Sequence, residues 1–296
     1  MNLRISEISN ARWQALATKE LLPFQQCREY GEAVEAIGGR IVRVEVHDHG
    51  RPIAVAQGLS RRFLLPVTLM TRGPVWIGSP TDLEKVSALR TLRDAFKGLL
   101  LVTPGVAQDD IQRRARFARF MTPSTLALLD LDAGMRRRLH GKWRNRLVKA
   151  EDAGLVLHRS KPGLDDLRWL LAADARQQRE KGYRALPHGF VVAWARNTPN
   201  ALLGLTAYRG TERLAAMLFL RHGTTATYHI GWSGETGRKL SAHNLLLWQA
   251  MRLMAEDGVR ALDLGLIDTE NAPGLARFKL GSGARPVPTG GTWLGW

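Results

Sequence analysis

The chain has 296 residues, which is enough for two domains of ordinary size. Hydrophobic residues make up 45% and charged residues 24% of it, which fits a globular protein with a buried core and excludes a disordered chain. Lys and Arg number 43 against 27 Asp and Glu, so the formal charge is +16. Such a charge attracts RNA, anionic lipid head groups or phosphorylated substrates, although a genome rich in arginine codons produces the same excess.

The residue types also limit the kinds of site. The single cysteine, Cys27, excludes an intramolecular disulfide and a cysteine-rich zinc site, and we interpret it as a buried small residue. Apart from His47-x-His49 in a turn, the histidines show no metal-ligand spacing, so we expect no metal site. The first residues lack the apolar core of a secretory signal, and no stretch reaches the roughly 18 apolar residues that span a bilayer. We therefore expect a cytoplasmic protein that can still lie on a membrane surface.

The first half of the chain predicts a mixed α/β arrangement. A helix is expected at 24–37, where Gly38 and Gly39 end it, and another at 82–97. Alternating or apolar runs, separated by turn residues such as 47–50, predict strands at 40–46, 51–59, 62–70 and 99–103.

The second half repeats this order of elements. Apolar residues at helical spacing predict helices at 134–153, 165–181, 188–196, 242–257 and 273–280. Short apolar runs predict strands at 201–208, 213–221, 225–231 and 259–264. We therefore expect an α/β fold of two tandem domains, residues 1–130 and 131–296. Each is a mixed, mostly antiparallel sheet flanked by helices, although no repeat is visible residue by residue.

A loop before the helix at 242–257 offers a site for an anion. A helix N-terminus exposes unpaired backbone N–H groups and carries partial positive charge, which favours phosphate. The side chains in the loop add charge or keep the turn small, although a plain helix cap at Ser241 is the alternative. The candidate donor-binding residues are Arg238, Lys239, Ser241, Ala242, His243 and Asn244. The corresponding loop at 78–82 lacks Arg and Lys and ends in Asp82, so we expect no donor site in the first domain.

A basic segment precedes the second domain's strands. Half of the residues from Arg136 to Lys149 are basic, and an apolar stripe recurs every four residues at Met135, Leu139, Trp143 and Leu147. No acidic residue lies among them, which favours contact with phosphates over a merely solvated face. The candidate polyanion-binding residues are Arg137, Lys142, Arg144, Arg146 and Lys149.

The C-terminal part contains a signature in two pieces. The first is Asp263-Leu264-Gly265-Leu266-Ile267, and the second is Gly274-Leu275-Ala276-Arg277-Phe278-Lys279-Leu280-Gly281. This order resembles the signature of the FemABX peptidoglycan-bridge aminoacyltransferases, a branch of the GNAT acyltransferases with two GNAT domains. Further matching segments are Arg72-Gly73-Pro74-Val75-Trp76, Trp143 to Glu151 with Gly154-Leu155, and Lys181-Gly182-Tyr183.

Two departures from the family pattern are visible. Leu266 stands where the family has a second glycine, and Arg238-x-x-Ser241-x-His243 replaces the Arg/Gln-x-x-Gly-x-Gly/Ala loop that holds coenzyme A in GNAT enzymes. No heptad segment lies between residues 155 and 200, so the coiled-coil arm of some members is expected to be absent.

The resemblance implies a degenerate, acceptor-side GNAT-like domain at 1–130 and a donor and transfer site at 131–296. It implies transfer of an aminoacyl or acyl group onto an amine, with aminoacyl-tRNA as co-substrate and no tightly bound cofactor. The acceptor would be a phosphorylated amine or an envelope precursor. An acyl-CoA or acyl-carrier-protein donor is the first alternative. A non-catalytic RNA- or membrane-surface-binding protein on the same fold is the second.

Lys279 is the expected catalytic residue. Acyl transfer passes through a tetrahedral oxyanion, which a fixed cation stabilises, and Lys279 adjoins a glycine-rich turn. A surface lysine beside a core Phe278 is the alternative. Asp263 either orients the lysine or caps the loop. The candidate cleft or acceptor residues are Tyr228, Trp232, Asp263 and Phe278, although aromatic residues in strands are typical of a core. No general base is evident.

Overall fold

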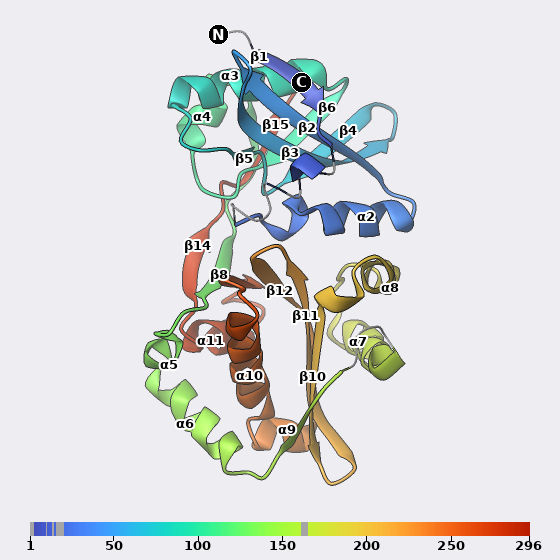
Figure 1. Ribbon diagram of the computed structural model, residues 1–296, viewed down its shortest axis with the longest axis vertical. Coiled ribbons are helices and arrows are strands. Elements are labelled where there is room, and N and C mark those ends of the chain that lie inside the picture. The colour runs from blue at the N-terminus through green and yellow to red at the C-terminus, as the bar shows by residue number, and fades with distance from the viewer. Residues whose placement is uncertain (1–2, 10, 14, 16–20, 161–164) are drawn as a thin grey trace. The chain divides into compact units, whose positions relative to one another are not determined.

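The computed structural model describes residues 3–9, 11–13, 15, 21–160 and 165–296. The chain divides into two compact units, residues 1–125 with 287–296, and residues 126–286 (Figure 1). This division differs from the expected boundary between residues 130 and 131. Strand β8 (Thr125–Asp130) belongs to the sheet of the second unit, and the final strand returns to the first.

The first unit is built on one sheet. Its strands follow the order β1 (Leu3–Glu7), β2 (Arg40–Asp48), β3 (Arg51–Arg62), β4 (Pro66–Thr71), β6 (Leu99–Thr103), β15 (Thr292–Gly295) and β7 (Ala118–Met121), with β5 (Val75–Trp76) on β3. β4 and β6 are parallel and are connected through α3 (Asp82–Ala95). The other helices are α2 (Arg28–Ala36) and α4 (Asp109–Arg114).

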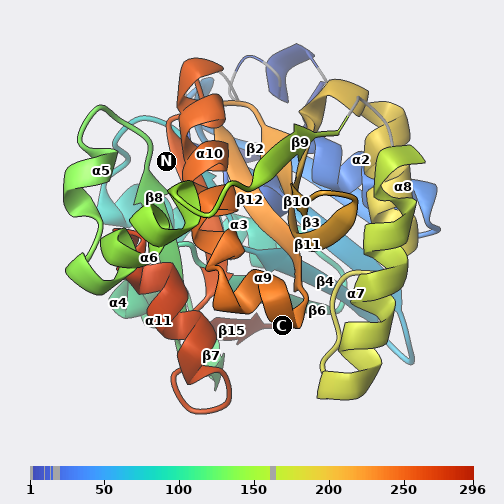
Figure 2. The same cartoon turned by 90° about the horizontal axis from the view of Figure 1, so that it is seen from below.

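The second unit contains a similar sheet. Its strands follow the order β14 (Arg285–Pro288), β8, β13 (Ala261–Leu266), β12 (Thr225–Ser233), β11 (Glu212–His222), β10 (Leu202–Arg209) and β9 (Val156–Arg159). Its helices are α5 (Met135–Arg138), α6 (Gly141–Glu151), α7 (Arg168–Lys181), α8 (His188–Asn197), α9 (Glu235–Lys239), α10 (Ala242–Glu256) and α11 (Pro273–Gly281). Figure 2 shows α7 and α8 on one face of this sheet, and α6, α10 and α11 on the other.

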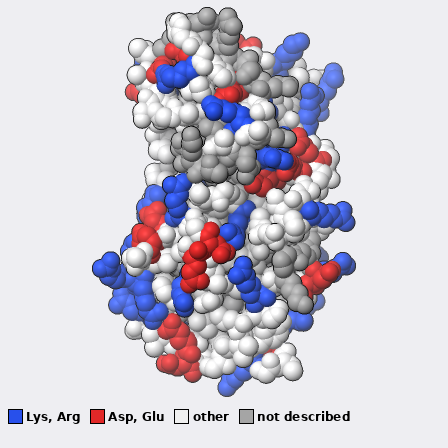
Figure 3. All heavy atoms as spheres, viewed as in Figure 1, with Lys and Arg blue, Asp and Glu red and all other residues white. Residues whose placement is uncertain are grey.

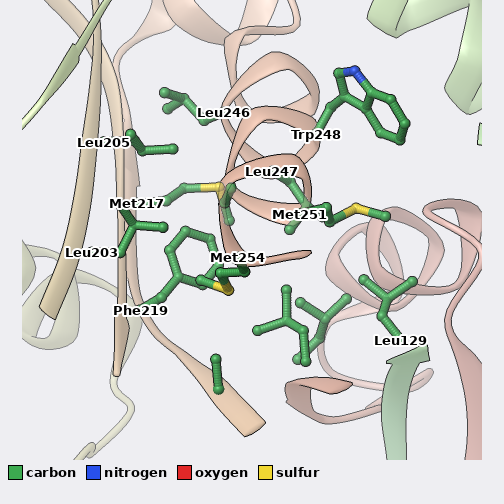
Figure 4. Close-up of a cluster of buried hydrophobic side chains, with 14 of the residues drawn as sticks. Leu129, Leu203, Leu205, Met217, Phe219, Leu246, Leu247, Trp248, Met251 and Met254 are labelled. Atoms are coloured by element: carbon green, nitrogen blue, oxygen red, sulfur yellow. The ribbon is translucent and has the colours of Figure 1, made fainter. Parts of the chain in front are cut away.

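The core of the second unit forms where α10 covers the sheet. Met217 and Phe219 of β11 lie between Leu203 and Leu205 of β10 and the buried face of α10, which includes Leu246 and Met254 (Figure 4). Each fully buried side chain of this size contributes roughly 1.5–3 kcal/mol. This packing fixes α10, and hence its N-terminus, against β10 and β11.

Two predicted helices are divided in the structure. The helix expected at 134–153 is broken into α5 and α6, because Leu139 is extended and the N–H of His140 donates to the carbonyl oxygen of Gly281 at 3.0 Å. The helix expected at 24–37 begins as a 3-10 turn at Phe24–Gln26, after which Cys27 caps α2 by accepting a bond from the N–H of Tyr30. Cys27 is buried, as expected, and burial raises the pKa of its thiol.

Candidate active site

The two units contain matching strand–helix–strand connections that differ in strand pairing. In the first unit, β4 and β6 pair from Val67–Leu99 to Thr71–Thr103. In the second, β12 and β13 pair from Thr225–Ala261 to Thr227–Asp263, after which the two strands separate. β12 continues to Ser233 and β13 to Leu266. The candidate site is formed by the residues held on these two separated strand ends.

Lys279 is held on the β13 side of this separation. Its side chain in α11 is buried, with 6% of the residue exposed, and its Nζ donates to the carbonyl oxygen of Leu266 at 2.7 Å. Burial lowers the pKa of the ammonium group, while the charge of Asp263 opposes that change. The alternative of a surface lysine is therefore wrong. A buried cation fixed by a neutral carbonyl oxygen is suited to stabilise negative charge that develops nearby.

Asp263 combines the two roles that the sequence left open. Its Oδ1 accepts a hydrogen bond of 2.7 Å from the N–H of Gly265, so it caps the turn at the end of β13. It is also the acidic group whose charge acts on Lys279. Gly265 has a φ of 79°, and a Cβ there would lie 3.8 Å from the Nζ of Lys279. Glycine therefore allows the left-handed turn at this position, while the space beside it would accommodate a Cβ at ordinary contact distance from the lysine.

Phe278 positions α11 against two other helices. Its carbonyl oxygen accepts a bond of 3.1 Å from the Nε1 of Trp143 in α6, and the two rings lie 6.1 Å apart. Its ring also lies 6.1 Å from that of His243 in α10. A Cβ at Gly281 would lie 2.8 Å from the indole of Trp143, so the glycine of the signature permits this packing. Phe278 thus orients the helix that carries Lys279.

The N-terminus of α10 is open to a ligand. Ser241 has a φ of 57°, a left-handed conformation that glycine adopts without strain, and its side chain makes no capping bond. The interpretation of Ser241 as a side-chain cap is therefore wrong. The N–H groups of Ala242 and His243 have no intrahelical acceptor at this helix end. Asn244 is 5% exposed, and its Nδ2 has no hydrogen-bond partner among the described residues. A buried amide without a partner favours a ligand acceptor at this turn.

The other loop residues are already engaged. The Nε2 of His243 donates to the carbonyl oxygen of Trp232 at 2.9 Å, and burial lowers the pKa of this imidazole. Arg238 donates to the carbonyl oxygen of Ser233 at 2.6 Å. Lys239 pairs with Glu235 at 2.7 Å in the short helix α9, which stands where the sequence predicted a loop. The charge of Lys239 is therefore offset, and Arg238 supplies the positive charge of this turn.

Tyr228 and Trp232 are packed against neighbouring aromatic side chains. Tyr228 lies 5.7 Å from the ring of Phe219, and burial raises the pKa of its hydroxyl. A Cβ at Gly231 would collide with that hydroxyl. Trp232 meets Trp169 of α7 edge-on at 5.5 Å. The core interpretation therefore describes Tyr228 better than the cleft interpretation does.

A buried polar network on the β12 side was not found from the sequence. Asp174 of α7 is 4% exposed, and its carboxylate accepts bonds from Gln178 Nε2 at 2.6 Å and Tyr183 Oη at 3.2 Å. The Nε2 of His188 lies 2.9 Å from the same carboxylate. The only sequence signal was the motif Lys181-Gly182-Tyr183, since Asp174 and His188 lie on different helices.

This network is connected both to β12 and to a pocket. Gln177 Nε2 donates to Tyr183 Oη at 3.0 Å and to the carbonyl oxygen of Gly231 at 3.2 Å. His229, on the same strand, has its pKa lowered to about 4 by burial, and Asp174 and His188 are its titratable neighbours. A pocket of about 510 Å³ is lined by residues 182–188 together with Ala175, Gln178 and Arg179. His188 therefore lies between a buried carboxylate and an open pocket.

The basic segment is less repulsive than its sequence indicated. Arg136 pairs with Glu151 at 3.2 Å and Arg138 with Asp132 at 2.8 Å, so flanking acids compensate two of its charges. Arg144 donates to the carbonyl oxygen of Leu139 at 3.1 Å. Within the described part of the chain, five exposed cations of α5 and α6 have no ion pair: Arg137, Lys142, Arg144, Arg146 and Lys149. Figure 3 shows Lys and Arg gathered over these helices.

None of the described helices is long and apolar enough to cross a membrane. Among the described side chains, no group of three or more His, Cys, Asp or Glu is placed to hold a metal ion.

Comparison with known proteins identifies the class of this site. Residues 136–280 match the model of a family described as "Acetyltransferase (GNAT) domain". This segment of the chain is similar to a GNAT acetyltransferase domain. This domain contains α6, the α10 turn and Lys279, so the expectation of an acyltransferase is confirmed. No curated protein matches the sequence.

The solved structures extend the likeness to the whole chain. FemX is similar over 98% of this chain and 96% of its own, with 14% identity and a TM-score of 0.79. The C-terminal domain of a putative lysylphosphatidylglycerol synthetase from Agrobacterium fabrum is similar over 97% of this chain and 91% of its own, with 15% identity and a TM-score of 0.58. A tandem GNAT protein from the clavulanic acid biosynthesis pathway is similar over 99% of this chain and 98% of its own, with 12% identity and a TM-score of 0.57. The expected tandem GNAT-like fold and the FemABX-like resemblance are thereby confirmed.

Proposed function

We propose that this GNAT protein transfers an aminoacyl group from tRNA to an amine. The observation that carries the proposal is the buried Lys279, fixed on Leu266 where β13 separates from β12. The acceptor nitrogen attacks the carbonyl carbon of the donor ester, so a C–N bond forms and the carbonyl oxygen becomes an oxyanion. When this intermediate collapses, the C–O bond to the ribose breaks, and the ribose oxygen leaves with the electron pair and takes up a proton. Lys279 stabilises the oxyanion.

His188 supplies the base that the sequence did not reveal. An amine is protonated near neutral pH and must lose a proton before or during attack. Asp174 holds the imidazole of His188 from the buried side, and the pocket at residues 182–188 receives the acceptor. Gln177 connects the network to Gly231 of β12, while Lys279 is fixed on β13. The two groups are thus attached to the two strands that separate at Thr227 and Asp263.

The pocket also favours an acidic acceptor. Arg179 and Arg184 are among its lining residues. Neither has an ion pair within the described residues. Guanidinium groups bind carboxylate and phosphate oxygens in pairs of hydrogen bonds. A phosphorylated amine or an envelope precursor is therefore the acceptor class that we propose.

We assign the donor-binding site to the second unit because the N-termini of α3 and α10 differ. At α3, Thr81 and Glu84 form a capping box, so the first-unit helix fills its own N-terminus with a carboxylate. At α10, the cap is open and the amide of Asn244 has no partner in the described structure. Phosphate is therefore favoured at α10 and disfavoured at α3. The first unit therefore receives no donor site in this proposal, and the acceptor pocket that we propose lies in the second unit rather than in the first.

An acyl-CoA donor is the second candidate. The open N-terminus of α10 suits a pyrophosphate, with Ser241, Ala242 and Asn244 as the residues that would hold it, and the matched family is an acetyltransferase family. His243 replaces a small residue of the usual loop, but its side chain is bonded to Trp232. The exposed cations of α5 and α6 and the likeness to FemX favour tRNA.

The test is to incubate the protein with charged tRNAs and, separately, with acyl-CoA or acyl-carrier protein, each with and without an amine acceptor. Amine-dependent deacylation of tRNA by the unmodified protein, lost in Lys279→Ala, supports the proposal. Turnover of acyl-CoA or acyl-carrier protein alone moves the assignment to the second candidate. Binding without turnover of any donor favours the non-catalytic alternative.

A further inference from the structure

The hairpin between β3 and β4 exposes three consecutive large apolar side chains. Phe63, Leu64 and Leu65 are 67%, 99% and 55% exposed. The strands beneath them are paired through Arg62–Pro66 and Arg61–Val67, and the N–H of Phe63 donates to the carbonyl oxygen of Leu65. Single exposed apolar residues are ordinary on protein surfaces. An uninterrupted run of them at a projecting turn lowers solubility, and such a run is typical of a site that contacts a protein partner or a membrane. Figure 1 shows this loop where β3 turns into β4.

Positive side chains surround the base of this hairpin. Arg61 and Arg62 are exposed directly before the apolar run, and the register places Arg40 opposite Ser60. Lys97 is also exposed. The next residue, Gly98, packs so closely against Pro66 at the base of the hairpin that a Cβ at this position would collide with the carbonyl oxygen of Pro66. None of these four cations has an ion pair among the described residues. The neighbouring acids Glu35 and Asp94 pair with Arg43 and Arg93.

We propose that this hairpin inserts its apolar tip into an anionic membrane surface, with Phe63, Leu64 and Leu65 among the acyl chains and the surrounding cations at the lipid phosphates. Apolar side chains at the centre and guanidinium groups at the rim match the two layers of a bilayer interface. A narrow, convex turn presents little area to a flat protein face, whereas it can enter a lipid surface without a preformed cavity. This inference does not depend on the proposed reaction.

Vesicle flotation tests the proposal with the full chain. The unmodified protein should float with vesicles of phosphatidylglycerol and phosphatidylcholine, and far less with phosphatidylcholine alone. Leu64→Asp should weaken binding at least tenfold, because it replaces an apolar side chain that we place among the acyl chains with a carboxylate. The double variant Arg61→Gln and Arg62→Gln should weaken it roughly 25-fold, since each basic residue near an anionic surface contributes about fivefold.

Leu83→Asp is the matched control. Leu83 is 61% exposed on α3, between Asp82 and Glu84, so the substitution has the same chemistry in acidic surroundings. It should leave flotation unchanged, and the thermal midpoints of all variants should match that of the unmodified protein. Flotation of Leu64→Asp equal to that of the unmodified protein, or no flotation of the unmodified protein, overturns the proposal.

A second measurement detects insertion directly. The one cysteine of the chain, Cys27, is buried, so Leu64→Cys can be labelled selectively with an environment-sensitive dye. Its emission should shift to the blue on addition of anionic vesicles, while labelled Leu83→Cys should not respond. A shift that instead follows protein concentration without lipid, together with a dimer that Leu64→Asp dissociates, would show self-association and overturn the lipid assignment.

Discussion

The Nζ of Lys279 and the carbonyl oxygen of Leu266 join α11 to the end of β13 across 2.7 Å. Because a carbonyl oxygen is neutral, this bond orients the ammonium group without cancelling its charge. Desolvation lowers the pKa of Lys279, and the negative charge of Asp263 acts in the opposite direction and raises that pKa. The ammonium group of Lys279 is thus held in one orientation at a buried position, where little water screens its charge.

Replacing Lys279 with alanine should reduce turnover far more than stability. A single oxyanion donor contributes roughly 2–4 kcal/mol of transition-state stabilisation, so kcat should fall by about 10²- to 10³-fold. Steady-state kinetics and thermal unfolding of the same preparations measure the two effects. Arg277→Ala, at an exposed position of the same helix, is the control and should retain activity. Near-normal turnover of Lys279→Ala would end this assignment.

Removal of the proposed base should change the pH profile. His188→Gln should lower kcat about 10²- to 10⁴-fold near neutral pH and abolish the decline of kcat/KM on the acidic side. Asp174→Asn should act in the same direction, because it removes the carboxylate that holds the imidazole. His158→Gln, on strand β9, is the control. A lowered thermal midpoint with an unchanged profile would mean that the network is structural.

The buried His229 should make stability depend on pH. Its pKa is about 4 in the folded protein, below the ordinary value of 6.5, because burial disfavours the charged form. As pH falls from about 6.5 to about 4, the unfolded chain binds a proton that the folded chain does not, so stability declines by at most about 1.4 kcal/mol per pH unit. Above this window the group has no effect.

Chemical denaturation at several pH values checks this expectation. His229→Gln should flatten the decline, whereas His49→Gln, in an exposed turn, should not. An equal slope for His229→Gln and the unmodified protein would refute the role of this imidazole.

The basic helices should distinguish tRNA from coenzyme A. If tRNA binds across α5 and α6, log K falls linearly with log salt by about 0.7–0.9 per phosphate contact. Replacing Arg137, Arg144 and Lys149 with alanine should flatten that slope by about two to three units if each side chain meets one phosphate. Coenzyme A affinity should hardly change. Alanine at Arg196, Arg209 and Arg277 removes the same charge from other exposed positions and is the control. A salt slope near zero for the unmodified protein would favour acyl-CoA.

The sequence predicted those parts of the site that are encoded locally. The period of its apolar residues located α10, and the glycine-rich signature led to Lys279. The break at Leu139 depends on a bond between His140 and Gly281, which no local pattern contains. The pairing of Asp174 with His188 likewise requires α7 and α8 to be packed together.

Short strands escaped prediction for a similar physical reason. β15 has four residues, and its partners in β6 lie far earlier in the chain, with Trp293 opposite Val102. Its position is stabilised by sheet bonds and by the burial of Trp293, not by local propensity. Long-range pairing also explains why the expected boundary after residue 130 differed from the division that the structure shows, because β8 pairs with β13 and β15 pairs with β6.

The placement of β15 between β6 and β7 has a consequence for synthesis on the ribosome. The sheet of the first unit lacks one of its inner strands until the entire second unit has been made, so the edges of β6 and β7 remain available for wrong pairing during translation. The sheet of the second unit ends with β14 and has no strand after Pro288 among the described residues. The nascent chain should therefore acquire its acyltransferase half first, and a single cut between the units should not yield a first unit that folds independently.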